Sequence, residues 1–502
     1  MNKNEQDQFV AKSSAQDAGF DLDGLSLPLS PAQLGVYFGH LRDVAGNRFN
    51  IGQVITIAGD LDIEVFRRAA AQVISETPAL NMAIVSAGDE PHQVHVDRSS
   101  VEIAFHDLRA AFDPEVARSA LLKQLLFTPF DLVRDPLFRW VLIKTRDGAT
   151  DWVQICHHIV VDAWSGQLLA SQVAARYGAL LGGEAVSGSA NAEAKPYADH
   201  IAEQIDYQSS DAAVREGGYW RDLLLGTDVA TLFETRHIKD HPANEPHFVR
   251  QGLVLDGERL KAVERLSKDH AITPGQVVVA VVAVLEATWA QRSDVVLGTP
   301  LSGRFGAAAR AVASMSSNVG HLRITEIWAH SVGSLLGAIK SQQLAGLRRQ
   351  RYRYEDLRRD LLGPGSEAFL ARVQVNQMSF EYDVRFGPLA SKTTNLTNGP
   401  VDGLSIVIYP QLYGRLAIDL NGVQSAFDLK TLEHIADQLL HLLDQFVSGP
   451  SDCALGALSL APSADVARIA GFNATSCAVE VGVLPDLLSE RAVLDVGSPA
   501  VV

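Results

Sequence analysis

Strand-like and helix-like segments alternate along this chain, and the same mixture recurs in two parts of similar size. Runs rich in β-branched and aromatic residues are separated by segments with apolar residues at helical spacing. The expected strands are 49–58, 139–144, 151–158, 249–255 and 294–297, and the expected helices are 60–76, 120–126 and 280–291. In a chain of 502 residues, this pattern predicts a duplicated α/β (α+β) fold with a cleft between its two parts.

Local signals mark where two helices begin. Ser30 and Gln33 form a capping box around Pro31, which fits the first helical position. Asp428 is the expected N-cap of a helix near the other end of the chain. The apolar face of that helix consists of Leu432, Ile435, Leu439, Leu442 and Phe446. Order is therefore expected from about residue 25, after a flexible leader.

Charge and cysteine content exclude several kinds of partner and site. Acidic residues number 59 against 43 basic ones, giving a net charge of −16. Nucleic acids and anionic membranes bind clustered positive charge, so neither is an expected partner. The three cysteines, Cys156, Cys453 and Cys477, are too scattered for a disulfide framework or a zinc motif. Without an apolar signal segment or a transmembrane stretch, the chain is expected in the cytoplasm.

The sharpest chemical feature is a pair of histidines at the end of the strand expected at 151–158. Alternation along a strand sends His157 and His158 to opposite faces, so only one of them can point into a given cleft. That histidine suits a general base or hydrogen-bond acceptor at neutral pH, with Asp162 forming an ion pair that shapes the loop. The alternative is two packed histidines that end a buried strand. A metal site is disfavoured because adjacent histidines diverge and no further ligands cluster nearby.

Other catalytic signatures are absent from the sequence. It contains neither a Gly-x-Ser-x-Gly nucleophile elbow nor a phosphate-binding loop with its lysine. Residues 298–304 contain two glycines but lack dinucleotide spacing, and they are expected to form a turn after a buried strand. The residues alone thus indicate an α/β protein with one candidate acid–base histidine.

His157-His158-x-x-x-Asp162 resembles the His-His-x-x-x-Asp-Gly motif of the condensation-domain and chloramphenicol acetyltransferase superfamily. Other stretches are similar to condensation domains in the same order: 28–33, 129–132, 135–139, 298–304, 316–323 and 351–357. The resemblance covers residues 25 to 460. Two departures stand out, since Ala163 replaces the glycine of the motif and 75–80 keeps little of the expected arginine- and histidine-containing motif.

The resemblance implies two acetyltransferase-like subdomains in a V-shaped pseudo-dimer around a tunnel, where carrier proteins present substrates on phosphopantetheine arms. It implies no directly bound cofactor. His158 would contact the attacking amine, as base or as positioning group, within a catalytic motif that includes His157, Asp162 and the backbone of Ala163. Asp162 would form a structural ion pair with Arg304. The remaining tunnel or substrate residues would be Trp164, Ser165 and Asn318.

The resemblance also implies an organisation and a set of partners. Residues 1–24 would be a leader, 25–205 and 206–460 the two subdomains, and 461–502 a linker toward an adenylation domain, whose beginning 472–475 resembles. The donor carrier would be a separate protein, with adenylation and acceptor carrier domains downstream. Residues 351–357 and 399–404 are most similar to the starter domain of enterobactin-type siderophore synthetases, which takes an aryl donor. Fatty-acyl and peptidyl donors, a non-catalytic recruitment domain and an acyltransferase that uses coenzyme A remain alternatives.

Overall fold

The computed structural model describes residues 26–87, 90–183, 194–227, 248–364, 366, 368–378, 384–411, 414–476, 483–494 and 496–497. The expected leader and Cys477 lie outside these residues. So does most of the segment 182–195, whose small and polar residues predict a loop. The chain divides into two compact units, Met1–Leu458 and Ser459–Val502.

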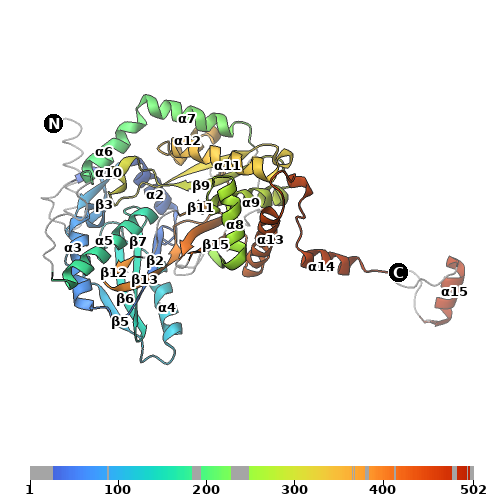
Figure 1. The fold of residues 1–502 in the computed structure, drawn as a ribbon, viewed down its shortest axis with the longest axis horizontal. Coiled ribbons are helices and arrows are strands. Elements are labelled where there is room, and N and C mark those ends of the chain that lie inside the picture. The colour runs from blue at the N-terminus through green and yellow to red at the C-terminus, as the bar shows by residue number, and fades with distance from the viewer. Residues whose placement is uncertain are drawn as a thin grey trace. The chain divides into compact units, whose positions relative to one another are not determined.

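The first large sheet contains six strands, and the strands expected at 49–58, 139–144 and 151–158 form its centre. Its order is β12 (Arg385–Phe386), β13 (Leu389–Thr397), β2 (Asn50–Ala58), β7 (Ala149–His157), β6 (Phe138–Arg146) and β5 (Ala104–Asp107). Helices α3 (Ile63–Glu76) and α5 (Ala163–Leu181) pack side by side on it (Figure 1). Phe66 of α3 meets Trp152 of β7 edge to face, with ring centroids 5.0 Å apart. The large apolar side chains of β7 are buried here, which explains why β-branched and aromatic residues are frequent in its sequence.

The second large sheet lies in the other part of the same unit. Its order is β10 (Asn318–Ile324), β9 (Val295–Leu301), β11 (Val373–Gln377), β14 (Leu404–Gln411), β15 (Arg415–Val423) and β8 (Phe248–Leu255). Helix α9 (Pro274–Ala290) packs on β9, and its run from Val277 to Leu285 is buried. Around α9 lie α8 (Gly257–Asp269), α11 (Val332–Leu347) and α13 (Leu429–Ser448) (Figure 1). The turn expected at 298–304 begins only at Ser302, because β9 continues through Leu301 to pair with β10.

The two sheets confirm the predicted α/β class, but chain order does not assign every strand to its own half. Strands β12 and β13 come late in the sequence and nevertheless pair with the first sheet, through Ser391–Thr397 of β13 and Gly52–Ile57 of β2. A smaller sheet joins β1 (Ser26–Pro28), β4 (Glu90–His95) and β3 (Met82–Ala87).

The predicted helix starts are confirmed. Ser30 and Gln33 form the capping box of α2 (Pro31–Arg42), with proline at its start, and Asp428 caps α13. The other helices of the first unit are α4 (Pro114–Phe127), α6 (Tyr197–Gln208), α7 (Asp211–Leu224), α10 (Gly306–Arg310) and α12 (Tyr354–Leu362). The second unit contains α14 (Ser463–Asn473) and α15 (Leu484–Leu494).

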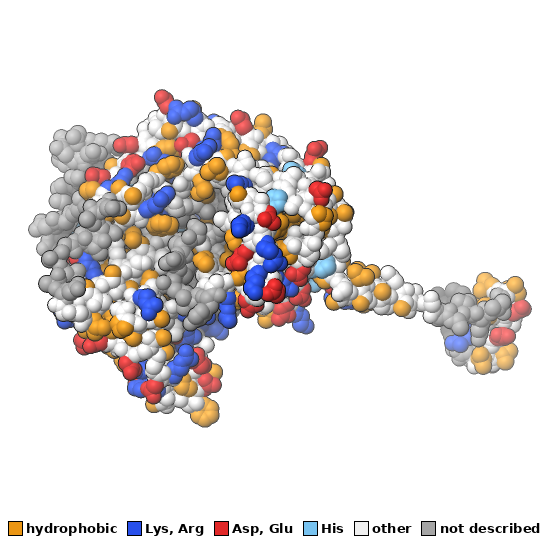
Figure 2. Space-filling model, in the orientation of Figure 1, with side chains coloured by type: hydrophobic (Ala, Val, Ile, Leu, Met, Phe, Trp, Pro, Cys, Tyr) orange, Lys and Arg blue, Asp and Glu red, His pale blue; other side chains and the backbone are white. Residues whose placement is uncertain are grey.

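Two further observations concern the surface and the length of the helices. On the face shown in Figure 2, basic side chains lie among acidic ones. Ion pairs between helices include that of Arg259 of α8 with Asp444 of α13. Among the described residues, no single helix has the length and hydropathy to span a membrane. Helices α8 and α9 pass that test only as a pair bent by 96°.

Candidate active site

The histidine pair lies where β7 ends and the chain turns toward α5. His157 is the last residue of β7, and the His158 N–H still donates to the Phe49 carbonyl at 2.8 Å. Asp162 then caps α5, because its carboxylate accepts from the Ser165 N–H at 2.9 Å. The strand and the capped helix together fix both ends of the short loop that contains His158.

His158 faces the cavity with one nitrogen committed to the protein. Its Nδ1 lies 3.0 Å from the Val161 carbonyl oxygen, which can only accept, so Nδ1 has the hydrogen. No described residue makes a hydrogen bond with Nε2. Burial lowers the pKa of His158 and outweighs the opposing attraction of Asp162. The ring is therefore neutral at neutral pH, with an unprotonated Nε2 as hydrogen-bond acceptor.

His157 lies on the opposite side of the strand, as its place in the alternation requires. It is fully buried, and its Nδ1 accepts from the Ile159 N–H at 3.2 Å. Nε2 therefore has the hydrogen and donates to Nδ1 of His40 at 3.2 Å. The pKa of His157 lies well below its usual value. Burial is the main cause, and repulsion from His40 is the second. These contacts make His157 a packed, neutral histidine that is separate from the cavity.

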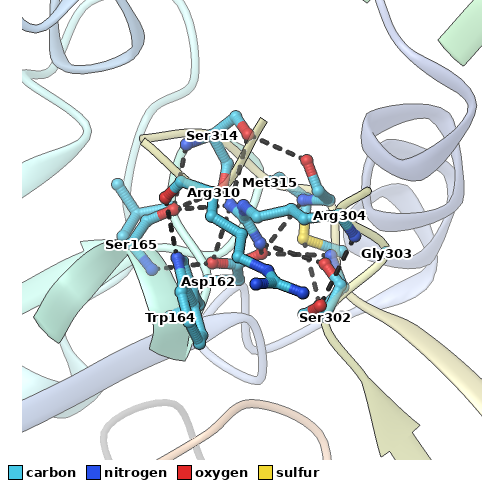
Figure 3. Close-up of polar contacts among 12 residues, drawn as sticks. Asp162, Trp164, Ser165, Ser302, Gly303, Arg304, Arg310, Ser314 and Met315 are labelled. Atoms are coloured by element: carbon cyan, nitrogen blue, oxygen red, sulfur yellow. Dashed lines mark hydrogen bonds and ion pairs between the residues drawn. The ribbon is translucent and has the colours of Figure 1, made fainter. Parts of the chain in front are cut away.

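Asp162 and Arg304 form a bidentate ion pair between the start of α5 and the segment after β9 (Figure 3). The guanidinium Nη1 donates to Oδ2 at 2.7 Å, and Nη2 donates to Oδ1 at 3.1 Å. Both side chains are almost fully buried. Oδ2 also accepts from the N–H groups of Ser316 and Ser317 at 3.1 and 3.0 Å. One carboxylate thus holds the first part of the chain to the 302–317 segment of the second.

The ion pair keeps Asp162 ionised inside the protein. Burial alone raises the pKa of this carboxyl, but the Arg304 charge and the donated hydrogen bonds outweigh burial and lower it. Arg304 makes further hydrogen bonds to Oγ of Ser165 at 2.7 Å and to the Ser314 carbonyl at 2.8 Å. Asp162 therefore has its charge compensated within this network and does not supply a free base to the cavity.

A cavity of about 630 Å³ lies beside His158. Both parts of the unit line it: His158, Ala163 and Trp164 come from the first, and Asn318 and Arg353 are among the residues from the second. Cavities of this size accommodate small organic substrates. The structure thus brings the neutral histidine to the wall of a space large enough for two reacting groups.

The other expected site residues occupy different positions. Trp164 lines the cavity and donates from Nε1 to the Arg310 carbonyl at 2.9 Å. Asn318 lines it too, but its amide donates to the carbonyls of Gln350 and Tyr352 and accepts from the Tyr354 N–H. Ser165 is fully buried, and its hydroxyl faces the ion pair instead of the cavity (Figure 3).

Ala163, which replaces the expected glycine, is the first residue of α5 and has no positive φ. A glycine here is not needed for backbone conformation, so alanine causes no strain. Its side chain lines the cavity and packs toward Met378, Val407, Tyr409 and Ala417. The alanine therefore affects the width of the cavity at this point.

Gly399 belongs to the 399–404 stretch that carries part of the family resemblance, but the sequence did not indicate it as a site residue. Its φ is +110°, and a Cβ at this position would lie 2.8 Å from Cδ2 of His158. Glycine is required both by the backbone and by the histidine ring. No local pattern marks this role, because the two residues are 241 positions apart in the sequence.

Comparison with known families and proteins gives a consistent result. The family model described as "Condensation domain" matches residues 25–469. Isonitrile lipopeptide synthase of Streptomyces coeruleorubidus is 32% identical to this chain over 86% of its residues. Dimodular nonribosomal peptide synthase of Bacillus subtilis (strain 168) is 29% identical over 94% of this chain. Enterobactin synthase component F of Escherichia coli (strain K12) is 24% identical over 94% of the chain. The chain spans 29%, 20% and 36% of the length of these relatives.

Solved structures show the same similarity. A mutant of the starter condensation domain of rhizomide synthetase RzmA in complex with C8-CoA aligns with a TM-score of 0.79 at 26% identity, over 89% of this chain and 99% of that one. The first condensation domain of the CDA synthetase aligns with a TM-score of 0.76 at 24% identity, over 87% and 99%, a likeness of fold.

Proposed function

Because the chain belongs to the condensation-domain family, whose members form amide bonds in nonribosomal peptide synthesis, we propose that its cavity joins a donor acyl thioester to the amine of an acceptor aminoacyl thioester. The observation that supports this assignment is the neutral His158, whose Nε2 has no described partner at the wall of the cavity. Phosphopantetheine arms of carrier proteins would present both thioesters.

In the proposed reaction, the acceptor nitrogen attacks the thioester carbon. A C–N bond forms, the C–S bond breaks, and the donor arm leaves as a thiolate that takes up a proton. An amine N–H would donate to Nε2 of His158, while the Val161 carbonyl holds the ring by Nδ1. Holding both reactants together can itself contribute about 7–11 kcal/mol. His158 thus acts as positioning group or base within a reaction driven largely by proximity.

Asp162 and Arg304 have a structural role in this proposal. Their buried pair fixes the end of the His158 loop against the 302–317 segment, and Ser165 completes that network. Asn318 fixes the backbone at 350–354, and Trp164 and Ala163 shape the cavity wall. His157 stabilises the end of β7 from the buried side.

We retain the expected subdomains 25–205 and 206–460, with a leader at 1–24 and a linker at 461–502. The two large sheets support this division, although β12 and β13 pair across it. The greater length of the relatives supports adenylation and carrier domains as partners within a synthetase. The similarity to the RzmA starter condensation domain supports a starter role. We further propose a separate donor carrier protein and a cytoplasmic reaction.

The test follows amide formation by mass spectrometry with a panel of acyl-coenzyme A donors and aminoacyl-N-acetylcysteamine acceptors, as surrogates for the carrier-bound substrates. His158→Ala should lower the single-turnover rate by about 10²–10⁴-fold, with the melting temperature largely unchanged. His158→Gln retains a hydrogen-bond acceptor, so partial rescue would indicate positioning and no rescue would indicate proton removal. Binding of donors without any transfer would instead support a non-catalytic recruitment domain.

A further inference from the structure

A row of polar side chains crosses the first sheet at one register. Asn395 of β13 pairs with Gln53 of β2, Gln53 with Gln154 of β7, and Gln154 with Trp140 of β6. Residues directly opposite each other in neighbouring strands share one face of the sheet. The three amides and the indole therefore lie side by side beneath the start of α5.

The neighbours of the row on β2 and β7 are mainly apolar, although the buried Thr150 and Thr393 also lie on this face. Two positions away along β2 lie Ile51 and Ile55, and two positions away along β7 lie Trp152 and Cys156, all buried. Buried amides need hydrogen-bond partners, because an unpaired group loses its contacts with water without replacement. A packed structural layer would normally continue the apolar pattern.

Three amide nitrogens in this region have no partner among the described residues. Gln53 donates from Nε2 to Oε1 of Gln154 at 2.6 Å, which leaves Nε2 of Gln154 without an acceptor. Nδ2 of Asn395 and Nδ2 of Asn398 are likewise buried and unpartnered. Gln154 and Asn395 are 4% and 2% exposed. Several hydrogen-bond donors are thus buried together without an acceptor.

These three amides line one pocket, whose other walls are mainly apolar and include Ile51 and Leu169. Gly166 of α5 also lines it, and a Cβ there would meet nothing closer than Nε2 of Gln53 at 3.9 Å. The free space is about 30 Å³, enough for about two water molecules. The residues that line both this pocket and the large cavity are Asp162, Ala163, Asn395, Thr397 and Asn398. The pocket therefore adjoins the reaction cavity beside the His158 loop.

We propose that this pocket receives the distal part of the donor acyl group and selects a short chain with a neutral hydrogen-bond-accepting oxygen over an alkyl chain of the same shape. The inference rests on the proposed function. The unpartnered amide nitrogens are hydrogen-bond donors, so they cannot accept a hydrogen bond from the acceptor's amine or ammonium group. They can donate to an oxygen atom of the acyl reactant. Asp162 and Arg304 already neutralise each other, so no free charge would balance a carboxylate. The small volume disfavours a long fatty-acyl chain.

The test compares two coenzyme A thioesters, 3-methoxybutanoyl and 3-methylpentanoyl, with the same spatial arrangement of groups at carbon 3. They differ only by an ether oxygen in place of a methylene. Wild-type protein should prefer the methoxy donor by at least about tenfold in kcat/KM. Isothermal titration of the same thioesters without acceptor should show a preference of the same direction. Because it needs no chemical step, the titration separates this inference from the proposed function.

Gln154→Leu should abolish or reverse the preference, because leucine removes the donor and extends the apolar wall. Thr150→Val is the matched control: Thr150 is also buried on β7 but does not line the pocket, so its variant should keep the preference. Asn395→Leu provides a second variant if Gln154→Leu does not fold.

The outcomes distinguish the inference about the pocket from the proposed amide-forming function. Equal use and equal binding of both donors by wild-type protein would overturn the inference and assign the amides to trapped water. A preference that persists in Gln154→Leu and Asn395→Leu would also overturn it. Preferential binding of the methoxy donor without any amide formation would support the pocket and refute the proposed function.

Discussion

The buried pair of Asp162 and Arg304 predicts strong energetic coupling between residues 142 positions apart. Arg304→Met leaves the Asp162 charge buried without its partner, which typically costs about 3–5 kcal/mol. Asp162→Ala leaves the Arg304 charge buried and also removes the N-cap of α5, a further loss of about 1 kcal/mol. It deprives the N–H groups of Ser316 and Ser317 of their acceptor as well. Asp162→Ala should therefore be the more destabilising substitution.

The double variant should lose less stability than the sum of the two single losses, by about 2–3 kcal/mol, because neither charge is then left alone. Hydrogen exchange at the Gly166 amide measures the local free energy of opening, because this N–H donates to the backbone carbonyl of residue 162 and keeps its acceptor in every variant. A local measurement also avoids the assumption that the whole unit, with its two large sheets, unfolds in one transition. Arg109→Met is a suitable control, since Arg109 pairs with Asp107 and Asp147 at the surface and should change little.

If the stability loss of the double variant equals the sum of the two single losses to within about 0.5 kcal/mol, the two charges do not interact in solution. The same conclusion would follow if Arg304→Met were as mild as Arg109→Met. Either result would remove the basis for treating the pair as the link between the His158 loop and the 302–317 segment.

Three further changes have defined outcomes. Ala163→Gly should increase the rate of amide formation with bulky donors, because it removes a methyl group that narrows the cavity. The melting temperature should fall slightly, since Ala163 has no positive φ and glycine relieves no backbone strain there. A lower rate with bulky donors would contradict this role. Gly399→Ala should lower the amide-forming rate and the melting temperature, since its Cβ would lie 2.8 Å from the His158 ring; an unaffected rate would show that the ring can move away. Acid should destabilise the fold. Burial lowers the pKa of His200 to about 4 and that of His321 to about 3, whereas both histidines have a pKa near 6.5 in the unfolded chain. As the pH falls below about 6.5, the unfolded chain therefore takes up protons first and is stabilised relative to the folded one. Melting temperatures should thus fall between pH 7 and pH 4, and a flat profile would exclude this contribution.

Local patterns in the sequence were sufficient for the strands and helix starts that they marked. The capping box at Ser30, the N-cap at Asp428 and the alternation around His157 and His158 each depend on residues within a few positions of one another. Backbone hydrogen bonding and side-chain periodicity act over that range, so the sequence predicts helix starts, strands and the opposite orientation of the two histidines.

The contacts that make the site depend on segments far apart in the chain. The family resemblance suggested Arg304 as partner of Asp162, but the support from Ser314, Ser316 and Ser317 appears only in the folded unit. Gly399 beside His158, and the pairing of β13 with β2, have no local signal at all.

The amide row shows the same division most clearly. In the sequence, Gln53 and Gln154 are polar residues within two largely apolar strands, and Asn395 lies more than 200 residues further along. Only strand register brings their side chains together on one face. Near neighbours in the sequence are enough to predict the marked strands, the helix starts and the opposite orientation of the two histidines. The ion-pair network, the cavity and its side pocket follow only from the folded unit, because register and packing between distant segments set which side chains meet.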